Sequence, residues 1–187
     1  MPKTYTRRNT NRIPRHNYST PGQYFLTICT ENRQQLFGTI KNDQMILNGV
    51  GNMINLWWQK TFEKYDHTLI NEYIIMPNHI HGIMNIVGAG SPRPDNNNND
   101  KIIGCGNHTP TIGNIIAYFK YQTTKQINES HNTPGKKIWQ RNYHDHIIRN
   151  DESLTNIRNY IVNNPATWQF DIENPDRIDN MNLENNV

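Results

Sequence analysis

Two histidines separated by a single residue, His79 and His81, have the type and spacing that a metal site needs. They lie in an apolar run rich in β-branched residues, 73–84, which residues 76–78 interrupt with a proline. That composition predicts two strands joined at 76–78. Because side chains alternate across a strand, both imidazoles then point to the same face and form half of a metal site. Taken alone, the pair is better explained as two ordinary histidines, one capping the turn and one packed.

A helix is predicted over residues 150–164, far along the chain from the two histidines. Asn150 or Asp151 caps its start, acidic side chains occupy its first turn, and Pro165 ends it. The stripe of this helix that faces the core consists of Leu154, Ile157 and Ile161.

Two polar side chains of this helix lie on or beside that stripe. At 3.6 residues per turn, Asn164 falls inside the stripe and Tyr160 lies at its edge, one turn earlier. A buried amide needs a polar partner, and a metal held by the two histidines would be one. The Tyr160 hydroxyl would then lie beside the metal. Spacing alone leaves an alternative open, in which Asn164 only ends the helix and Tyr160 packs at the edge of the core.

Four sequence blocks, in a fixed order, contain or flank these candidate residues. They are residues 23–30 with Arg33 and 36–38, then 77–82, 138–149 and 160–165. Together they resemble the REP-associated tyrosine transposases, a branch of the single-tyrosine HUH transposases of bacterial insertion sequences. HUH denotes two histidines around a hydrophobic residue, here His79, Ile80 and His81. The resemblance covers roughly residues 12 to 168, and the ordered set is far more specific than the triplet.

The resemblance implies both a site and a reaction. Tyr160 would be the nucleophile, and His79, His81 and Asn164 would hold a divalent metal. The family implies Mg²⁺ or Mn²⁺, although an imidazole-rich site also suits Zn²⁺. The implied reaction is metal-dependent cleavage and transfer of single-stranded or hairpin DNA through a covalent 5′-phosphotyrosine. The implied assembly is a monomer or a homodimer.

The remaining periodicities predict an α+β fold, because long helices mix with strands that include adjacent hairpin pairs. Strands are predicted at 23–30, 67–76, 79–87 and 143–149, a hairpin over 36–47, and helices over 49–65 and 111–128. The resemblance implies a ferredoxin-like antiparallel sheet with helices on one side and the HUH motif on a central strand. We predict one domain over residues 1–170, with a flexible insertion at 88–110, and a polar C-terminal tail at 171–187.

The formal net charge of +3 is spread unevenly along the chain. Residues 1–30 contain five cationic side chains and no acid, and residues 116–141 contain five against Glu129 alone. Basic clusters interleaved with tyrosines suit a phosphate backbone and stacked, unpaired bases. A solvated basic face is the commoner explanation for any one cluster. The predicted DNA contacts are Arg7, Arg8, Arg12, Arg15, Lys120 and Arg141.

Composition also indicates where the protein acts. The sequence contains no apolar stretch of membrane-spanning length, and its first 30 residues are polar and basic, unlike a signal peptide. Its two cysteines are expected to be reduced thiols. These features predict a cytoplasmic protein, and the family resemblance implies a bacterial, nucleoid-associated one.

Three other functions stay open on the sequence. A module of the same fold could bind hairpin DNA without cutting it, although the complete set of His79, His81, Tyr160 and Asn164 argues against this. A replication-type HUH nickase commonly has further domains and another motif order. A metal-dependent hydrolase would keep the histidines but tolerate loss of the tyrosine hydroxyl.

Overall fold

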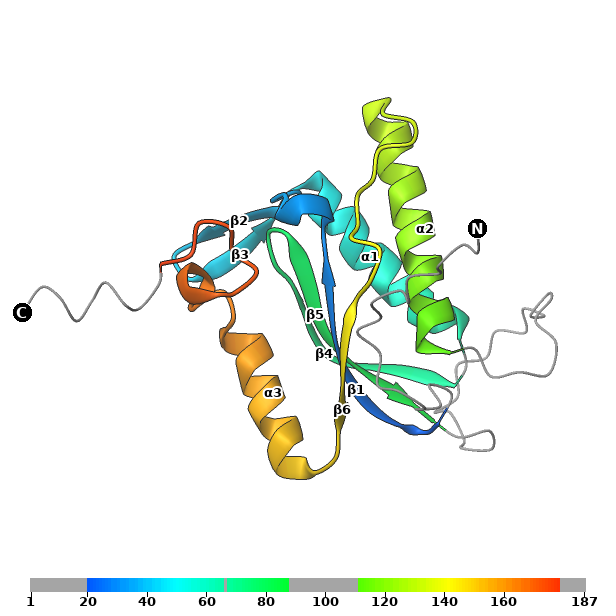
Figure 1. Ribbon diagram of the computed structural model, residues 1–187, viewed down its shortest axis with the longest axis vertical. Coiled ribbons are helices and arrows are strands. Elements are labelled where there is room, and N and C mark those ends of the chain that lie inside the picture. Colours follow the sequence, from blue (N-terminus) through cyan, green and yellow to red (C-terminus); the bar gives the residue numbers. More distant parts are fainter. Residues whose placement is uncertain (1–19, 66, 88–110, 179–187) are drawn as a thin grey trace, which may run out of the picture.

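The computed structural model describes residues 20–65, 67–87 and 111–178, and Figure 1 shows how their elements are arranged. The elements lie within a few residues of the predicted bounds. In chain order they are β1 (Gly22–Cys29), η1 (Glu31–Arg33), β2 (Gly38–Lys41), β3 (Gln44–Leu47), α1 (Gly49–Lys64), β4 (Thr68–Ile75), β5 (His79–Ile86), α2 (Ile112–His131), β6 (His144–Ile148), α3 (Asp151–Asn163) and η2 (Trp168–Phe170).

The main sheet has four strands in the order β4-β5-β1-β6, and every pair in it is antiparallel. Without the separate β2-β3 hairpin, the strands and α-helices from β1 to β6 follow the order β-α-β-β-α-β, which is the ferredoxin-like arrangement, and α3 comes after them. The predicted fold class is therefore confirmed, and the strand that carries both histidines, β5, is internal.

The two faces of the sheet are covered differently. Helices α1 and α2 lie together on one face (Figure 1) and bury a core that includes Leu26, Ile80 and Met84 from the strands. The opposite face, toward which His79 and His81 point, carries Ile83, and this residue packs with Leu154 and Ile161 of α3. Helix α3 is thus positioned over the histidine face by the apolar stripe predicted from its sequence.

The ends of the helices agree with their sequence signals. Asn150 caps α3 by accepting a hydrogen bond from the Ser153 N–H at 2.8 Å, and two acidic residues follow in the first turn. The last helical residue, Asn163, comes two positions before Pro165. These signals determine where α3 starts and stops, and hence how far along the sheet its last turn reaches.

The turn between β4 and β5 is held rigidly by the residues around it. Its Met76 N–H donates to the His79 carbonyl at 2.8 Å, while Thr30 and Phe37 donate to the carbonyls of Asn78 and Pro77. Further along β5, a Cβ on Gly82 would lie 2.8 Å from Cζ2 of Trp58. The glycine that follows His81 therefore allows α1 to pack closely on the back of the histidine strand.

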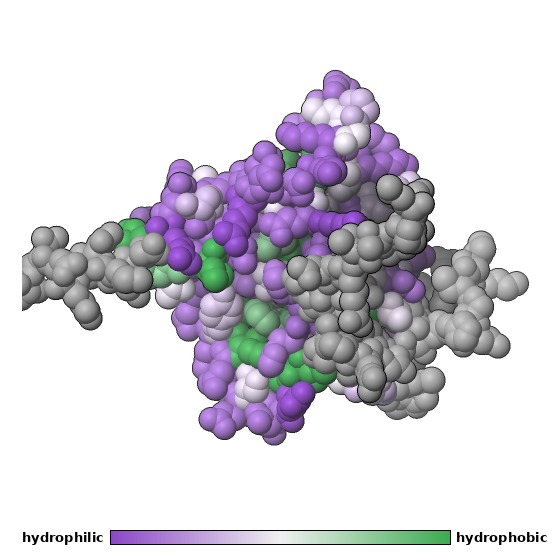
Figure 2. Space-filling view, viewed as in Figure 1, coloured by the Kyte–Doolittle hydropathy of each residue, from purple (hydrophilic) through white to green (hydrophobic). Residues whose placement is uncertain are grey.

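The visible face of the molecule is mostly hydrophilic, with a group of apolar residues exposed in the region between α3 and β6 (Figure 2). Among the residues that the structure describes, no helix combines the length and the apolar character that a membrane crossing requires. The predicted insertion at 88–110 lies outside the described residues.

Candidate active site

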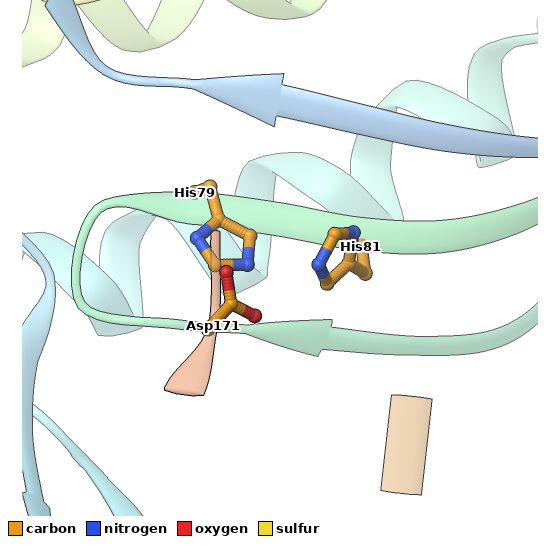
Figure 3. A group of neighbouring side chains, drawn as sticks. All are labelled: His79, His81 and Asp171. Atoms are coloured by element: carbon orange, nitrogen blue, oxygen red, sulfur yellow. The ribbon is translucent and has the colours of Figure 1, made fainter. Parts of the chain in front are cut away.

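His79 and His81 are buried side by side on the face of β5 that α3 covers. Their exposed fractions are 0% and 3%, and their ring centroids lie 4.3 Å apart. In Figure 3 both imidazoles project from β5 toward the same space, beside the carboxylate of Asp171. The predicted orientation of the two histidines is therefore found in the fold.

The tautomer of His79 follows from its neighbour Asn78. The Asn78 amide nitrogen donates to the carbonyls of Arg33 and Glu173, at 3.1 and 2.7 Å, which turns its oxygen toward His79. That oxygen lies 2.8 Å from Nδ1 of His79, so Nδ1 carries the proton and donates. The buried Nε2 atom of His79 therefore carries a lone pair, and it has no hydrogen-bond partner. A metal ion is the kind of partner that such an atom accepts.

His81 connects the sheet to α3. Its Nδ1 atom lies 3.0 Å from the Thr27 hydroxyl on β1, and its Nε2 atom lies 3.1 Å from the Tyr160 hydroxyl. Phe25, also on β1, stacks on the imidazole with centroids 5.3 Å apart and contacts the Tyr160 ring edge-on. These contacts fix both the plane of the imidazole and its distance from the tyrosine.

Helix α3 supplies Tyr160 and is directly followed by Asn164. The Asn164 side chain is fully buried, as its place in the apolar stripe predicts, while Tyr160 is 41% exposed. The Asn164 amide nitrogen donates to Asp171 at 2.8 Å, and its oxygen is buried without a hydrogen-bond partner. The site thus holds two unpartnered buried atoms suited to a metal, on Asn164 and on His79.

Asp171 is the site residue that the sequence did not reveal. Its carboxylate accepts from Asn164, from Tyr160 at 3.4 Å, and from the Glu173 N–H at 2.7 Å. One ligand atom each from His79, His81 and Asp171 lie within 4.8 Å of one another, so this buried group could hold a metal ion. Asp171 belongs to the segment predicted as a polar tail, yet it is only 7% exposed.

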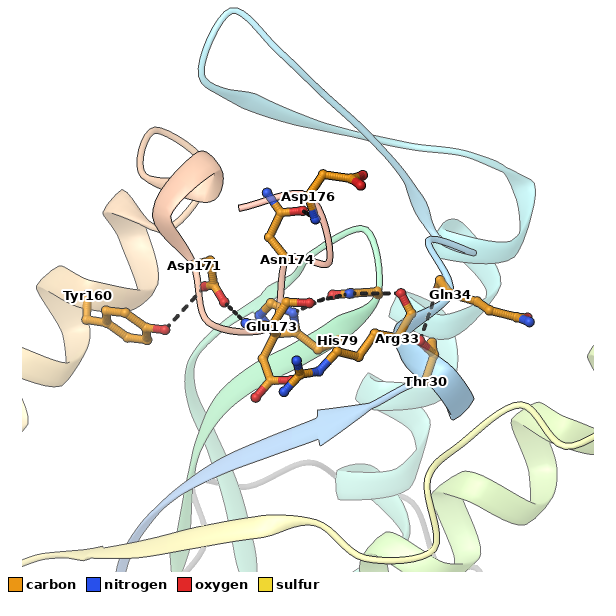
Figure 4. Close-up of polar contacts among 10 residues, drawn as sticks. Thr30, Arg33, Gln34, His79, Tyr160, Asp171, Glu173, Asn174 and Asp176 are labelled. Carbon is orange, nitrogen blue, oxygen red and sulfur yellow. Dashed lines mark hydrogen bonds and ion pairs between the residues drawn. The ribbon is translucent and has the colours of Figure 1, made fainter. Parts of the chain in front are cut away.

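The segment after Asp171 is anchored to the far side of the site. Glu173 pairs with Arg33 at 3.1 Å, and its carbonyl accepts the hydrogen bond from Asn78 described above. Figure 4 shows this chain of contacts running from Tyr160 through Asp171 to Arg33. Residues 171–174 therefore close the site rather than trail from it, and residues 179–187 lie outside the described part of the chain.

Burial controls the charge of the two histidines and of Tyr160. It lowers the pKa of His79 to about 3, with Arg33 contributing, and it lowers the pKa of His81 well below the usual value. Burial also raises the pKa of Tyr160, and the negative charge of Asp171 raises it further. Without a metal the site therefore contains two neutral imidazoles and a neutral phenol.

The metal-free protein is expected to lose stability in acid because of these histidines. Below about pH 6.5 an unfolded histidine binds a proton, whereas folded His79 stays neutral down to about pH 3. The free energy of unfolding should thus fall as the pH drops through this window, by up to about 1.4 kcal/mol per pH unit for each histidine. Urea unfolding with a chelator at pH 7.5, 6 and 5 measures this. A free energy of unfolding that does not change over this pH range would contradict the prediction.

The other residues predicted for the site lie elsewhere. Lys120 donates to the carbonyls of Gln140 and Asn142, both at 2.8 Å, and burial lowers its pKa to about 8, so it holds the 140–142 loop against α2. Arg141 is exposed on the same surface. The four predicted N-terminal arginines, Arg7, Arg8, Arg12 and Arg15, lie outside the described residues. Cys29 is a free, buried thiol whose pKa is raised to about 12.

Comparison with known proteins places the chain among transposase relatives. An uncharacterized protein of Haemophilus influenzae is 37% identical over 167 residues, which cover 88% of this chain and 91% of that protein. A second protein of that organism, named "Putative REP-associated tyrosine transposase", is 28% identical over 81% of this chain and 74% of its own. No model matched when the chain was compared with models of protein families.

A solved structure of a REP-associated tyrosine transposase bound to a REP hairpin has the same fold. It superposes with a TM-score of 0.51 and 20% identity, over 84% of this chain and 74% of that one. The chain belongs to one family with the 37% identical protein. The predicted resemblance to the REP-associated tyrosine transposases is confirmed in sequence and in fold.

Proposed function

Because the chain is a relative of the REP-associated tyrosine transposases, we propose that it cleaves and transfers single strands of hairpin DNA through a covalent 5′-phosphotyrosine at Tyr160. One observation carries the proposal. The hydroxyl of a half-exposed tyrosine lies 3.1 Å from His81, in a buried cluster whose polar atoms suit a divalent metal. The related solved structure, which holds a REP hairpin, supports DNA as the substrate.

We propose Mg²⁺ or Mn²⁺ as the metal, held by His79, His81, Asn164 and Asp171. The fit rests on the unpartnered His79 Nε2 and Asn164 oxygen atoms and on the neighbouring carboxylate. A carboxylate and an amide oxygen add hard ligands to the two imidazoles, which suits these ions better than an imidazole pair alone. When bound, such an ion would draw charge from the scissile phosphate and favour the phenolate of Tyr160.

The reaction exchanges one phosphodiester for another. The Tyr160 oxygen attacks phosphorus, the bond from phosphorus to the 3′ oxygen breaks, and the phenol proton ends on that leaving 3′ oxygen. Rejoining reverses the exchange with a different 3′-hydroxyl. Because the phosphotyrosine bond retains the free energy of the phosphodiester, no nucleotide cofactor is needed. Phe25 and Thr27 keep His81 in place beside Tyr160 throughout.

We place the DNA backbone along a basic groove beside α2. This groove encloses about 430 Å³ and is lined by five cationic residues, including Lys120 at its inner wall. The other four are Lys125, Lys136, Lys137 and Arg141. Tyr121, which is 64% exposed, also lines it and offers a face for stacking. Lys120 then serves mainly to shape the groove, and the exposed cations serve to neutralise phosphates.

Removing the exposed charges of this groove should weaken DNA binding in a salt-dependent manner. In a Lys136→Ala, Lys137→Ala double variant, the slope of log affinity against log salt should shrink by about 0.7 to 0.9 for each phosphate that the variant no longer neutralises. Fluorescence anisotropy with hairpin DNA between 50 and 300 mM salt measures the slope. Lys41→Ala, on the β2-β3 hairpin, is the matched control. Equal slopes for all three proteins would remove the groove from the DNA path.

The test of the function is a search for the covalent intermediate. The protein is incubated with end-labelled hairpin DNA taken from its own gene flanks, with Mn²⁺ or with EDTA, and resolved on a denaturing gel. The proposal is supported by a metal-dependent band in which DNA is covalently linked to the protein and the attachment lies in the peptide that contains Tyr160. Cutting without linkage indicates a hydrolase, and binding without cutting indicates the non-catalytic module.

Location and assembly follow from the proposed substrate. A protein that acts on genomic DNA is expected in the bacterial cytoplasm at the nucleoid. The expected assembly, a monomer or a homodimer, stays a prediction that sedimentation would resolve.

A further inference from the structure

An open pocket of about 480 Å³ adjoins Tyr160, and neither Asp171 nor Glu173 lines it. Its floor is formed by Phe25 of β1 and His146 of β6, which are paired across the sheet, and its wall by α3. The residues of α3 that matter here are Glu152, Asn156, Ile157 and Tyr160. Apolar residues are visible in this region, between α3 and β6, among hydrophilic ones (Figure 2).

The lining of this pocket differs from that of the basic groove. Among the residues that the structure describes, no lysine or arginine lines it, and Glu152 adds a carboxylate, so the pocket does not suit a phosphate. Phe25, Ile157 and Tyr160 offer aromatic and aliphatic surface, while His146, Glu152 and Asn156 offer donors and acceptors at the rim. A flat ring with apolar faces and a polar edge matches this combination, and a nucleobase is such a ring.

We propose that this pocket receives the base of a nucleotide next to the scissile phosphate, and so selects the position of cleavage. This inference rests on the proposed function, because Tyr160 lines the pocket and also attacks the phosphate. A base stacked on Phe25 would be held within one nucleotide of the Tyr160 hydroxyl. The pocket would therefore set the register of the strand, while the basic groove holds its backbone.

The rim indicates which base is favoured. A carboxylate accepts hydrogen bonds only, so Glu152 favours a base with an exocyclic amino group, namely guanine, cytosine or adenine, over thymine. Asn156, one turn further along α3, both donates and accepts, and it can pair with the remaining edge of the base. Glu152 is thus the specificity-determining residue, and Asn156 assists it.

The test uses hairpin oligonucleotides whose two nucleotides flanking the cleavage position carry each base in turn or no base. An abasic nucleotide keeps its sugar and phosphate, so it separates recognition of the base from contact with the backbone. For the wild-type protein we expect an abasic site at one flanking position to weaken binding about tenfold or more, from the energy of one stacked base. Thymine there should weaken binding less.

Variants of the pocket residues test whether this loss of binding affinity arises at the pocket. Phe25→Leu keeps apolar volume but removes the stacking surface. For this variant, the abasic oligonucleotide should therefore bind almost as tightly as the oligonucleotide with the base present. In Glu152→Gln, the preference against thymine should shrink, whereas Asp151→Asn, which removes a neighbouring charge outside the pocket, should keep it. If the abasic penalty and the base preference are the same in all variants, the pocket is not a base site.

The outcomes separate this inference from the proposed function. Covalent linkage with unchanged base preference in the variants overturns the pocket and leaves the function standing. Base-dependent binding that the variants remove, without any linkage to Tyr160, supports the pocket and overturns the covalent reaction. Failure to bind any oligonucleotide, including a pool with randomised flanks, overturns both.

Discussion

Tyr160→Phe is expected to abolish the protein-linked DNA product and to slow strand cleavage by at least about 10³-fold. The substitution removes the one oxygen proposed to attack the phosphate, and no other step can replace it. The ring should stay in place, because Phe25 contacts it edge-on and α3 remains packed through Leu154 and Ile161. Single-turnover cleavage of labelled hairpin DNA with Mn²⁺ measures the effect.

The matched control for this experiment is Tyr73→Phe. This substitution also removes a hydrogen-bonded hydroxyl, which donates to Asn55. Tyr73, however, lies on β4 and packs against the core formed with α1 and α2. Its cleavage rate should stay near that of the wild type. DNA binding by Tyr160→Phe should also persist, which shows that the protein is folded. Cleavage at an undiminished rate in Tyr160→Phe would show that water, not the tyrosine, attacks the phosphate.

Local periodicity explains why the proximity of the four candidate residues could be predicted from sequence, whereas their roles as metal ligands and nucleophile rest on the family resemblance. A spacing of two along a strand brings His79 and His81 together, and a spacing of four along a helix brings Tyr160 and Asn164 together. The apolar stripe of α3 then determines which face of the sheet receives the helix. Each of these inferences needed only one regular element and its contact with the core.

Asp171 escaped prediction because no regular element positions it. It follows the short η2 turn, and its place depends on contacts between residues far apart in sequence, such as the pairing of Glu173 with Arg33. A polar, acidic segment near the end of a chain commonly stays at the surface. The one signal in the sequence was that acidic residues outnumber basic ones from residue 171 onward, in a protein expected to bind a cation. This signal did not identify a particular residue.

The charge pattern was informative about a surface but not about individual residues. The cluster over 116–141 predicted a basic face, and a basic groove is found there. Lys120, however, is turned inward to the carbonyls of Gln140 and Asn142, an orientation that depends on how the 140–142 loop folds back on α2. Sequence composition counts such a lysine as a surface charge, while the fold uses it as a hydrogen-bond donor.

Asp171→Asn is expected to lower the affinity of the DNA-free protein for Mn²⁺ by about 10- to 100-fold. The new side chain keeps the volume of Asp171 but only one of its two acceptor oxygens, so it can accept from Asn164 or from the Glu173 N–H, not from both, while the negative charge is removed. Two neutral imidazoles then remain with two neutral amides, a weaker set of ligands for a hard divalent ion. Isothermal titration calorimetry measures the affinity without any reaction.

Comparison with two further variants separates the two roles open to this carboxylate. Asp176→Asn, an exposed carboxylate nearby, should keep the wild-type affinity. Asn164→Ala should lose affinity as well if its unpartnered oxygen is a ligand. If Asn164→Ala weakens Mn²⁺ binding and Asp171→Asn does not, the carboxylate only orients the amide through the 2.8 Å hydrogen bond. A loss in both variants would mean that the metal centre combines two imidazoles, an amide and a carboxylate, with the C-terminal segment as part of the active site.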